Sequence, residues 1–184
     1  LPGEEKGILH KPFRWSVISQ PSMSIGQEVA VTNLQIAMAM AAIANGGELL
    51  KPQIVKSADT SASAAPHVVR HVIRPDVARA VRDLLVSAVE DEMATGKKAK
   101  VGTVGVGGKT GTAQVADPKT GGYYADRFVS SFVGFLPARD PSLVISVVVH
   151  EPNVSIGHFG GDVAAPAFSK VAAAAVKLGV GLGP

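Results

Sequence analysis

A glycine-rich segment, Gly107-Gly108-Lys109-Thr110-Gly111-Thr112, constrains the fold of this sequence most. It combines one cation, two hydroxyl groups and three glycines, and it leads into a β-type alternation of residues. A phosphate-binding loop of the Walker type requires a glycine at position 103, where this chain has threonine, and a helix after the lysine. We therefore predict a strand over residues 106–115 and not a phosphate loop.

The predicted strand has side chains and a backbone suited to a small anionic ligand. Lys109 supplies a positive charge, Thr110 and Thr112 supply hydroxyl donors, and Gly111 lets another backbone approach closely. Backbone N–H groups of such a strand can also stabilise an oxyanion. Strict alternation places Lys109 and Thr110 on opposite faces, so both reach one ligand only if the strand twists or the ligand lies along its edge. An ordinary glycine-containing strand with a solvated lysine fits the composition equally well.

Two further β-type segments follow, at residues 127–136 and 143–150, each bounded by proline or aspartate. The connections are short, with turn residues at 117–122 and at Asp140-Pro141, and they predict an antiparallel meander of three strands. An alanine-rich helix is then predicted over residues 166–178, with Pro166 in its first turn because proline does not fit a helix interior.

The clearest helix of the first half is predicted over residues 31–45. Thr32 and Gln35 have the spacing of a capping box, and Asn45-Gly46-Gly47 provides the C-terminal stop. The interior is apolar nearly all round, which is typical of a helix buried on every side. Burying such a helix is difficult within a chain of this length, which indicates that the chain is part of a larger body.

The other first-half segments are predicted as an arm, two short strands and a second helix. Residues 1–23 are expected to be extended, with Phe13 and Trp15 packed on a neighbouring part, and strands are expected at 53–55 and 67–73. The second helix begins at Pro75, since proline suits a first turn. Its apolar stripe is formed by Val77, Val81, Leu84, Leu85 and Ala88. Together, these elements predict an α+β fold, in which an antiparallel sheet has the C-terminal helix on one face and the two central helices on the other.

Composition narrows the class of protein. The 184 residues are 46% hydrophobic, enough for one domain with a core, and they include no cysteine, which excludes disulfides and cysteine metal sites. A net charge of +3, without basic runs mixed with aromatics, argues against nucleic-acid binding. His150, Glu151 and His158 lack the spacing of metal ligands, so we expect neither a metal nor a cofactor.

The residues at 109–113, Lys-Thr-Gly-Thr-Ala, match the third motif of the penicillin-recognising serine transpeptidases. The resemblance extends in order and spacing along the chain, and it is to the class B penicillin-binding proteins. Before the motif it rests on residues 1–4, 15, 24–27, 31–35 and 43–47, and after it on residues 131–137, 160–161 and 164–168. Asn33 stands where the family usually has proline.

This resemblance implies a partial fold of the penicillin-binding protein and serine β-lactamase type. It implies peptidoglycan cross-linking outside the cytoplasmic membrane, in which a serine attacks a stem peptide ending in D-Ala-D-Ala and β-lactams trap that serine. Lys109 would then help to polarise the site, Thr110, Gly111 and Thr112 would bind the substrate terminus, and the backbone N–H of Thr112 would donate to the oxyanion.

The family also requires Ser-x-x-Lys and Ser-x-Asn, and this sequence contains neither. In the family, both motifs precede the segment that residues 1–4 resemble. We therefore interpret residues 1–184 as the C-terminal portion of a transpeptidase domain of a membrane-anchored parent, with the serine-bearing N-terminal portion as its partner. The isolated chain is predicted to have no turnover and to form no penicilloyl adduct.

Two other functions share some of these features. A serine β-lactamase of the same superfamily also carries Lys-Thr-Gly, although the flanking segments here are closer to the transpeptidases, and a deacylation rate would separate the two. A non-catalytic assembly or binding module could keep the fold for its contacts alone. An intact Ser-x-x-Lys in the preceding sequence would argue against that second alternative.

Overall fold

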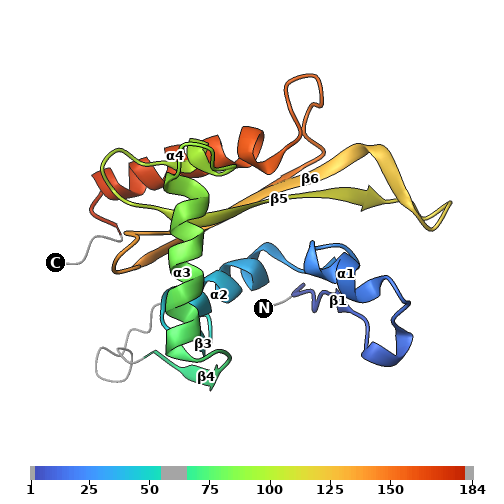
Figure 1. Cartoon of the computed structure of the whole chain (residues 1–184), viewed down its shortest axis with the longest axis horizontal. Helices are drawn as coiled ribbons and strands as arrows, with labels where there is room; N and C mark the ends of the chain where they lie inside the picture. The colour runs from blue at the N-terminus through green and yellow to red at the C-terminus, as the bar shows by residue number, and fades with distance from the viewer. Residues whose placement is uncertain (1–2, 55–65, 181–184) are drawn as a thin grey trace.

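The computed structural model describes residues 3–54 and 66–180, and the α+β class is confirmed (Figure 1). The central sheet has three antiparallel strands in the order β5-β6-β7, and two small sheets pair β1 with β2 and β3 with β4. In chain order, the elements are β1 (Ile8–Leu9), a 3-10 helix (Pro12–Arg14), α1 (Ser19–Ser24), β2 (Val29–Ala30), α2 (Asn33–Ala44), β3 (Glu48–Leu50), β4 (Val68–His71), α3 (Pro75–Glu90), a second 3-10 helix (Lys97–Ala99), β5 (Gly107–Ala116), β6 (Tyr123–Leu136), β7 (Leu143–His150) and α4 (Gly160–Lys177).

The predicted meander is confirmed, and its middle strand is longer than expected. β6 begins at Tyr123, where it pairs with Ala116 across an irregularity in the register. Asp117 closes the connecting turn, since its side chain accepts a hydrogen bond from the Lys119 N–H at 2.9 Å. The β5–β6 hairpin therefore projects well beyond the helices, as Figure 1 shows.

The two faces of the sheet are covered by different helices, as alternation of side chains requires. Phe132 points to the face under α4, where its ring meets Phe168 edge-on at 4.7 Å between centroids. Phe135 points to the opposite face and packs with Met40 and Ala44 of α2. Figure 1 shows α4 and α2 on opposite sides of the strands.

α3 crosses the sheet at β5 and contributes to both hydrophobic clusters. Leu85 and Val86 pack with the α2 cluster, whereas Val89 belongs to the α4 cluster. The predicted stripe of α3 was therefore partly wrong, since Leu84 is 70% exposed and Val77 is 39% exposed. The buried face follows from the crossing at β5, which the periodicity of α3 alone does not specify.

The capping box of α2 is confirmed, and its burial on every side is not. The Gln35 N–H donates to Thr32 Oγ1, and the Gln35 side chain accepts from the Thr32 N–H. Gly47 ends the turn after the helix with φ +111°, a conformation suited to glycine. Leu34 is 42% exposed, because the sheet covers only one side of α2 within the described residues.

Three other expectations differ from the structure. The first small strand lies at β3, where it pairs with β4, while residues 53–54 are irregular and Val55 lies outside the described residues. The arm is not extended throughout, since β1 pairs with β2 and Phe13 is 78% exposed. Trp15 donates its indole N–H to the His10 carbonyl of the same arm.

The C-terminal helix begins at Gly160, so Pro166 lies inside it and the prediction of a first-turn proline was wrong. The glycines at 160 and 161, which resemble a loop in sequence, form the first turn because they let the helix approach the sheet closely. None of the helices in the described ranges is both long and apolar enough to cross a lipid bilayer.

Candidate active site

The Lys-Thr-Gly-Thr residues occupy β5, one of the two edge strands of the central sheet. β6 pairs with one edge of β5, and no strand of the described part of the chain pairs with the other. The register places Thr110 opposite Phe132 and Thr112 opposite Ser130, so both threonines point to the face covered by α4. An outer strand exposes backbone N–H and C=O groups, which gives this edge the capacity to bind an extended chain.

The lysine reaches the face of the threonines around the free edge of β5. Lys109 opposes Val133 and therefore starts on the α2 face. Its Nζ nevertheless lies 3.1 Å from the Thr110 carbonyl oxygen and 3.5 Å from Thr110 Oγ1. The Lys109 ammonium and the Thr110 hydroxyl group thus lie side by side, although their Cβ atoms start on opposite faces of the sheet.

The hydroxyl group of Thr112 is oriented by the first turn of α4. Its Oγ1 accepts a hydrogen bond from the Gly160 N–H at 3.0 Å. A Cβ at Gly160 would lie 2.3 Å from the Ser131 carbonyl oxygen and 2.4 Å from that of Gly111, so only glycine fits this approach. Because Thr112 Oγ1 accepts from Gly160, its own proton stays available to an anion at the strand edge.

The loop before α4 carries His158 and Phe159, and it packs against β6. The ring of His158 stacks on Phe128 at 4.2 Å and contacts Phe159 at 4.3 Å between centroids. Ser130 Oγ donates to the His158 carbonyl and fixes this loop against β6. The sequence excluded His158 only as a metal ligand, and its spacing gave no sign that its ring stacks on Phe128 of β6.

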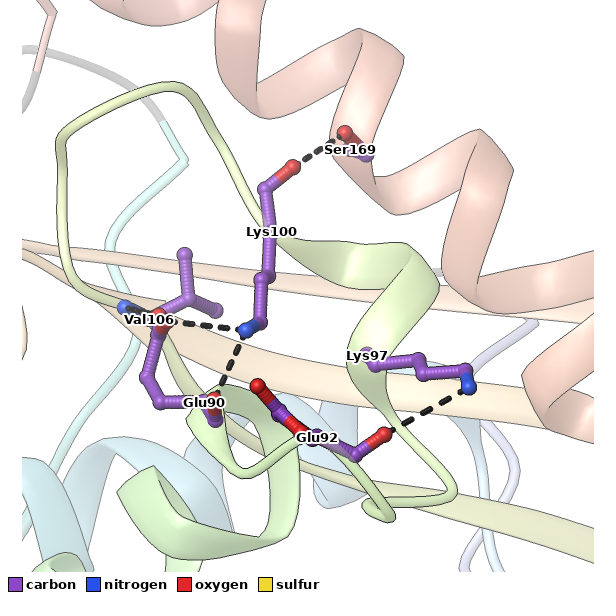
Figure 2. Close-up of polar contacts among 6 residues, drawn as sticks. All are labelled: Glu90, Glu92, Lys97, Lys100, Val106 and Ser169. Atoms are coloured by element: carbon purple, nitrogen blue, oxygen red, sulfur yellow. Dashed lines mark hydrogen bonds and ion pairs between the residues drawn. The ribbon is translucent and has the colours of Figure 1, made fainter.

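The connection from α3 to β5 is held by a polar network that the sequence did not indicate (Figure 2). The Glu90 carboxylate accepts a hydrogen bond from the Val106 N–H at 2.9 Å and lies 3.7 Å from Lys100 Nζ. The Lys100 carbonyl accepts a hydrogen bond from Ser169 of α4 at 2.6 Å. The network therefore fixes the point where the chain enters β5, relative to both α3 and α4.

A cavity of about 760 Å³ lies on the α2 face, between the sheet and the N-terminal arm. Gly111 and Thr112 line it together with apolar side chains such as Ile25, Val129 and Val148, while Lys109 and Thr110 do not. The Lys109 ammonium and the Thr110 hydroxyl group therefore lie at the strand edge, outside this largely apolar space.

A charged cluster is formed by Arg127 and Tyr124 of β6 and by Glu151, the residue after β7. The Arg127 guanidinium pairs with Glu151 and lies 4.6 Å from the centre of the Tyr124 ring. The hydrogen bond from Arg127 holds the pKa of the Glu151 carboxyl below its ordinary value of 4.5. The same pairing raises the pKa of Arg127.

Residues 1–173 match the family model of the penicillin binding protein transpeptidase domain, and the chain belongs to this family. It is 37% identical to the probable peptidoglycan D,D-transpeptidase PbpC of Pseudomonas aeruginosa, over 96% of this chain and 30% of that protein. It is 36% identical to the corresponding PenA of Neisseria flavescens, over 100% of this chain and 43% of that protein. The chain thus spans less than half the length of these relatives.

Solved structures give the same result. The transpeptidase domain of Burkholderia pseudomallei penicillin-binding protein 3 matches with a TM-score of 0.84 and 38% identity, over 100% of this chain and 54% of that chain. Penicillin-binding protein 3 of Mycobacterium tuberculosis, complexed with aztreonam, matches with a TM-score of 0.82 and 32% identity, over 100% and 43%.

Proposed function

We propose that this chain is the C-terminal portion of a D,D-transpeptidase domain that cross-links peptidoglycan on the outer side of the cytoplasmic membrane. Its share of the active site is Lys109, Thr110, Gly111 and Thr112. The observation that carries the proposal is the position of the Lys109 ammonium, which bends around the free edge of β5 to within 3.5 Å of the Thr110 hydroxyl oxygen.

Each group at this edge has a chemical role in the proposed reaction. The terminal carboxylate of a D-Ala-D-Ala stem peptide binds near the Lys109 ammonium, and it accepts hydrogen bonds from the hydroxyl groups of Thr110 and Thr112. The peptide lies along β5 as an added strand. The backbone N–H of Thr112 donates to the carbonyl oxygen as negative charge develops on it.

The nucleophile comes from outside these residues, since the sequence lacks Ser-x-x-Lys. The serine oxygen attacks the penultimate D-Ala carbonyl, its proton passes to a base of the serine-bearing portion, and the C–N bond breaks as the terminal D-Ala leaves with a proton on its amine. An amine of a second stem peptide then attacks the acyl ester, which forms the cross-link and restores the serine hydroxyl.

The comparisons support this assignment at the level of the class of enzyme. Curated relatives are named peptidoglycan D,D-transpeptidases, and the Mycobacterium tuberculosis relative has been solved with aztreonam and with ampicillin. Binding of β-lactams by the intact protein follows from the proposed function, because a β-lactam presents an anionic group and an acylating carbonyl in much the same relation as the substrate.

Covalent labelling by a fluorescent penicillin tests the proposal. In the intact domain, which would include a Ser-x-x-Lys motif, we expect labelling that Lys109→Ala slows by roughly 100-fold or more, the scale for loss of one electrostatic group in an acyl-transfer site. Lys119→Ala, in the exposed β5–β6 turn, is the matched control and leaves the rate unchanged. Labelling of residues 1–184 alone, or a Lys109→Ala variant as fast as the control, would contradict the proposal.

A further inference from the structure

Thr95 lies in the connection from α3 to β5 and contacts the substrate-binding strand through its hydroxyl group. Its Oγ1 is 3.3 Å from Thr110 Oγ1, and either oxygen can be the donor. Among the described residues, Thr95 has the one side-chain hydroxyl group outside β5 that lies within hydrogen-bond distance of Thr110 Oγ1. Thr95 itself is exposed, so it does not belong to the hydrophobic core.

The connection that carries Thr95 is held against both α4 and α3. Toward α4, a Cβ at Gly161 would lie 2.4 Å from the Thr95 carbonyl oxygen, so the two backbones are in close contact. Lys98 pairs with Asp162 of the same helix at 2.7 Å. Lys100 binds the end of α3 through the Glu90 carbonyl at 2.7 Å, a contact visible in Figure 2.

The number of protons around Thr110 determines what Thr95 can do. Thr110 Oγ1 has one proton and two lone pairs, and Lys109, which can only donate, lies 3.5 Å from it. If Thr110 donated its proton to Thr95, it would have no proton left for an anion. If Thr95 donates to Thr110 instead, both lone pairs of Thr110 are occupied by donors and its proton points to a third partner.

We infer that Thr95 is a positioning residue that donates its hydroxyl proton to Thr110, so that Thr110 presents its own proton to the carboxylate of the substrate. The inference rests on the proposed function and adds to it a residue outside the Lys-Thr-Gly-Thr motif. Thr95 does not touch the substrate, and it acts only through the orientation of Thr110. Binding of a carboxylate selects this direction of the hydrogen bond, because an anion accepts and does not donate.

The test is the acylation rate of the intact transpeptidase with two probes, a penicillin with a free carboxylate and the methyl ester of the same penicillin. Thr95→Val removes the hydroxyl group and keeps the β-branched shape, while Thr95→Ser keeps the hydroxyl group. We expect Thr95→Val to slow acylation by the free acid roughly 3- to 10-fold, the scale of one neutral hydrogen bond. The rate with the ester and the rates of Thr95→Ser stay near those of the parent protein.

A double-mutant cycle separates positioning from a general structural effect. In a Thr110→Val background, the added Thr95→Val change is expected to have no further effect on the free acid, because the two residues act through one hydroxyl group. Thr95→Ala replaces Thr95→Val in the same cycle if the latter lowers the melting temperature.

Three results would overturn the inference while the proposed function stands. They are an unchanged rate of Thr95→Val with the free acid, an equal slowing with acid and ester, and effects of Thr95 and Thr110 that simply add. If the parent protein is acylated by neither probe, the proposed function fails first, and the inference fails with it.

Discussion

The close approach of α4 to β5 makes a sharp prediction for Gly160→Ala. The added Cβ would lie 2.3 Å from the Ser131 carbonyl oxygen, whereas ordinary contacts begin at 3.4 Å, so the helix must retreat by about 1 Å. The three nearest atoms, which belong to Ser131 and Gly111, are all backbone atoms, so no rotamer change relieves the clash. Overpacking of this kind costs about 1–3 kcal/mol. Weakening the hydrogen bond from the Gly160 N–H to Thr112 Oγ1 costs about 0.5–1.5 kcal/mol more.

We therefore expect a loss of about 1.5–4.5 kcal/mol in the free energy of unfolding. Each kcal/mol lowers Tm by roughly 2–4 °C in a domain of 150–250 residues and by less in a larger one. Thermal unfolding of the intact domain by circular dichroism measures it. Gly122→Ala is the matched control, since its Cβ would meet only Thr120 Oγ1 at 3.6 Å, and its Tm should change by no more than about 2 °C. A Gly160→Ala protein as stable as this control would refute the reasoning.

Three further predictions concern the core, a helix cap and an ion pair. Phe132→Ala should lower the free energy of unfolding by about 3–5 kcal/mol in chemical denaturation, because it removes a fully buried ring that packs on Phe168. Thr32→Ala should cost about 1 kcal/mol in the same assay, whereas Thr32→Ser should cost much less, because serine keeps the capping oxygen. Arg127 lowers the pKa of Glu151, so the stabilisation is present above pH 4.5 and is lost as pH falls through the lowered pKa. An NMR titration of the Glu151 carboxyl in the parent protein and in Arg127→Gln should show the pKa rising in the variant; an unchanged pKa would contradict the pairing.

The parts of the fold that the sequence predicts are those with local signals. The strand of the Lys-Thr-Gly motif, the strand at 143–150 and the capping box at Thr32 and Gln35 all depend on alternation, turn residues or cap spacing within a few positions. The start of α4 depends instead on a long-range contact. Gly160 begins a helix because it lies against Gly111, 49 positions earlier in the chain, and the sequence near it resembles a loop.

The candidate site divides in the same way. The motif residues follow from their own chemistry and from the family resemblance. Thr95 contacts Thr110 from 15 positions away, and Glu90 contacts Val106 from 16 positions away. Neither residue has a partner at helical or strand spacing, so no periodic pattern could identify it. Lys109 was expected on the far face, and only the free edge of β5 in three dimensions explains how its ammonium reaches Thr110.

The most direct measurement is a crystal structure of the intact protein after reaction with a penicillin. We predict an ester to a serine outside residues 1–184, with the carboxylate of the drug at about 3 Å from the hydroxyl oxygens of Thr110 and Thr112. An ester on any serine within this chain, or a carboxylate bound away from β5, would contradict the account.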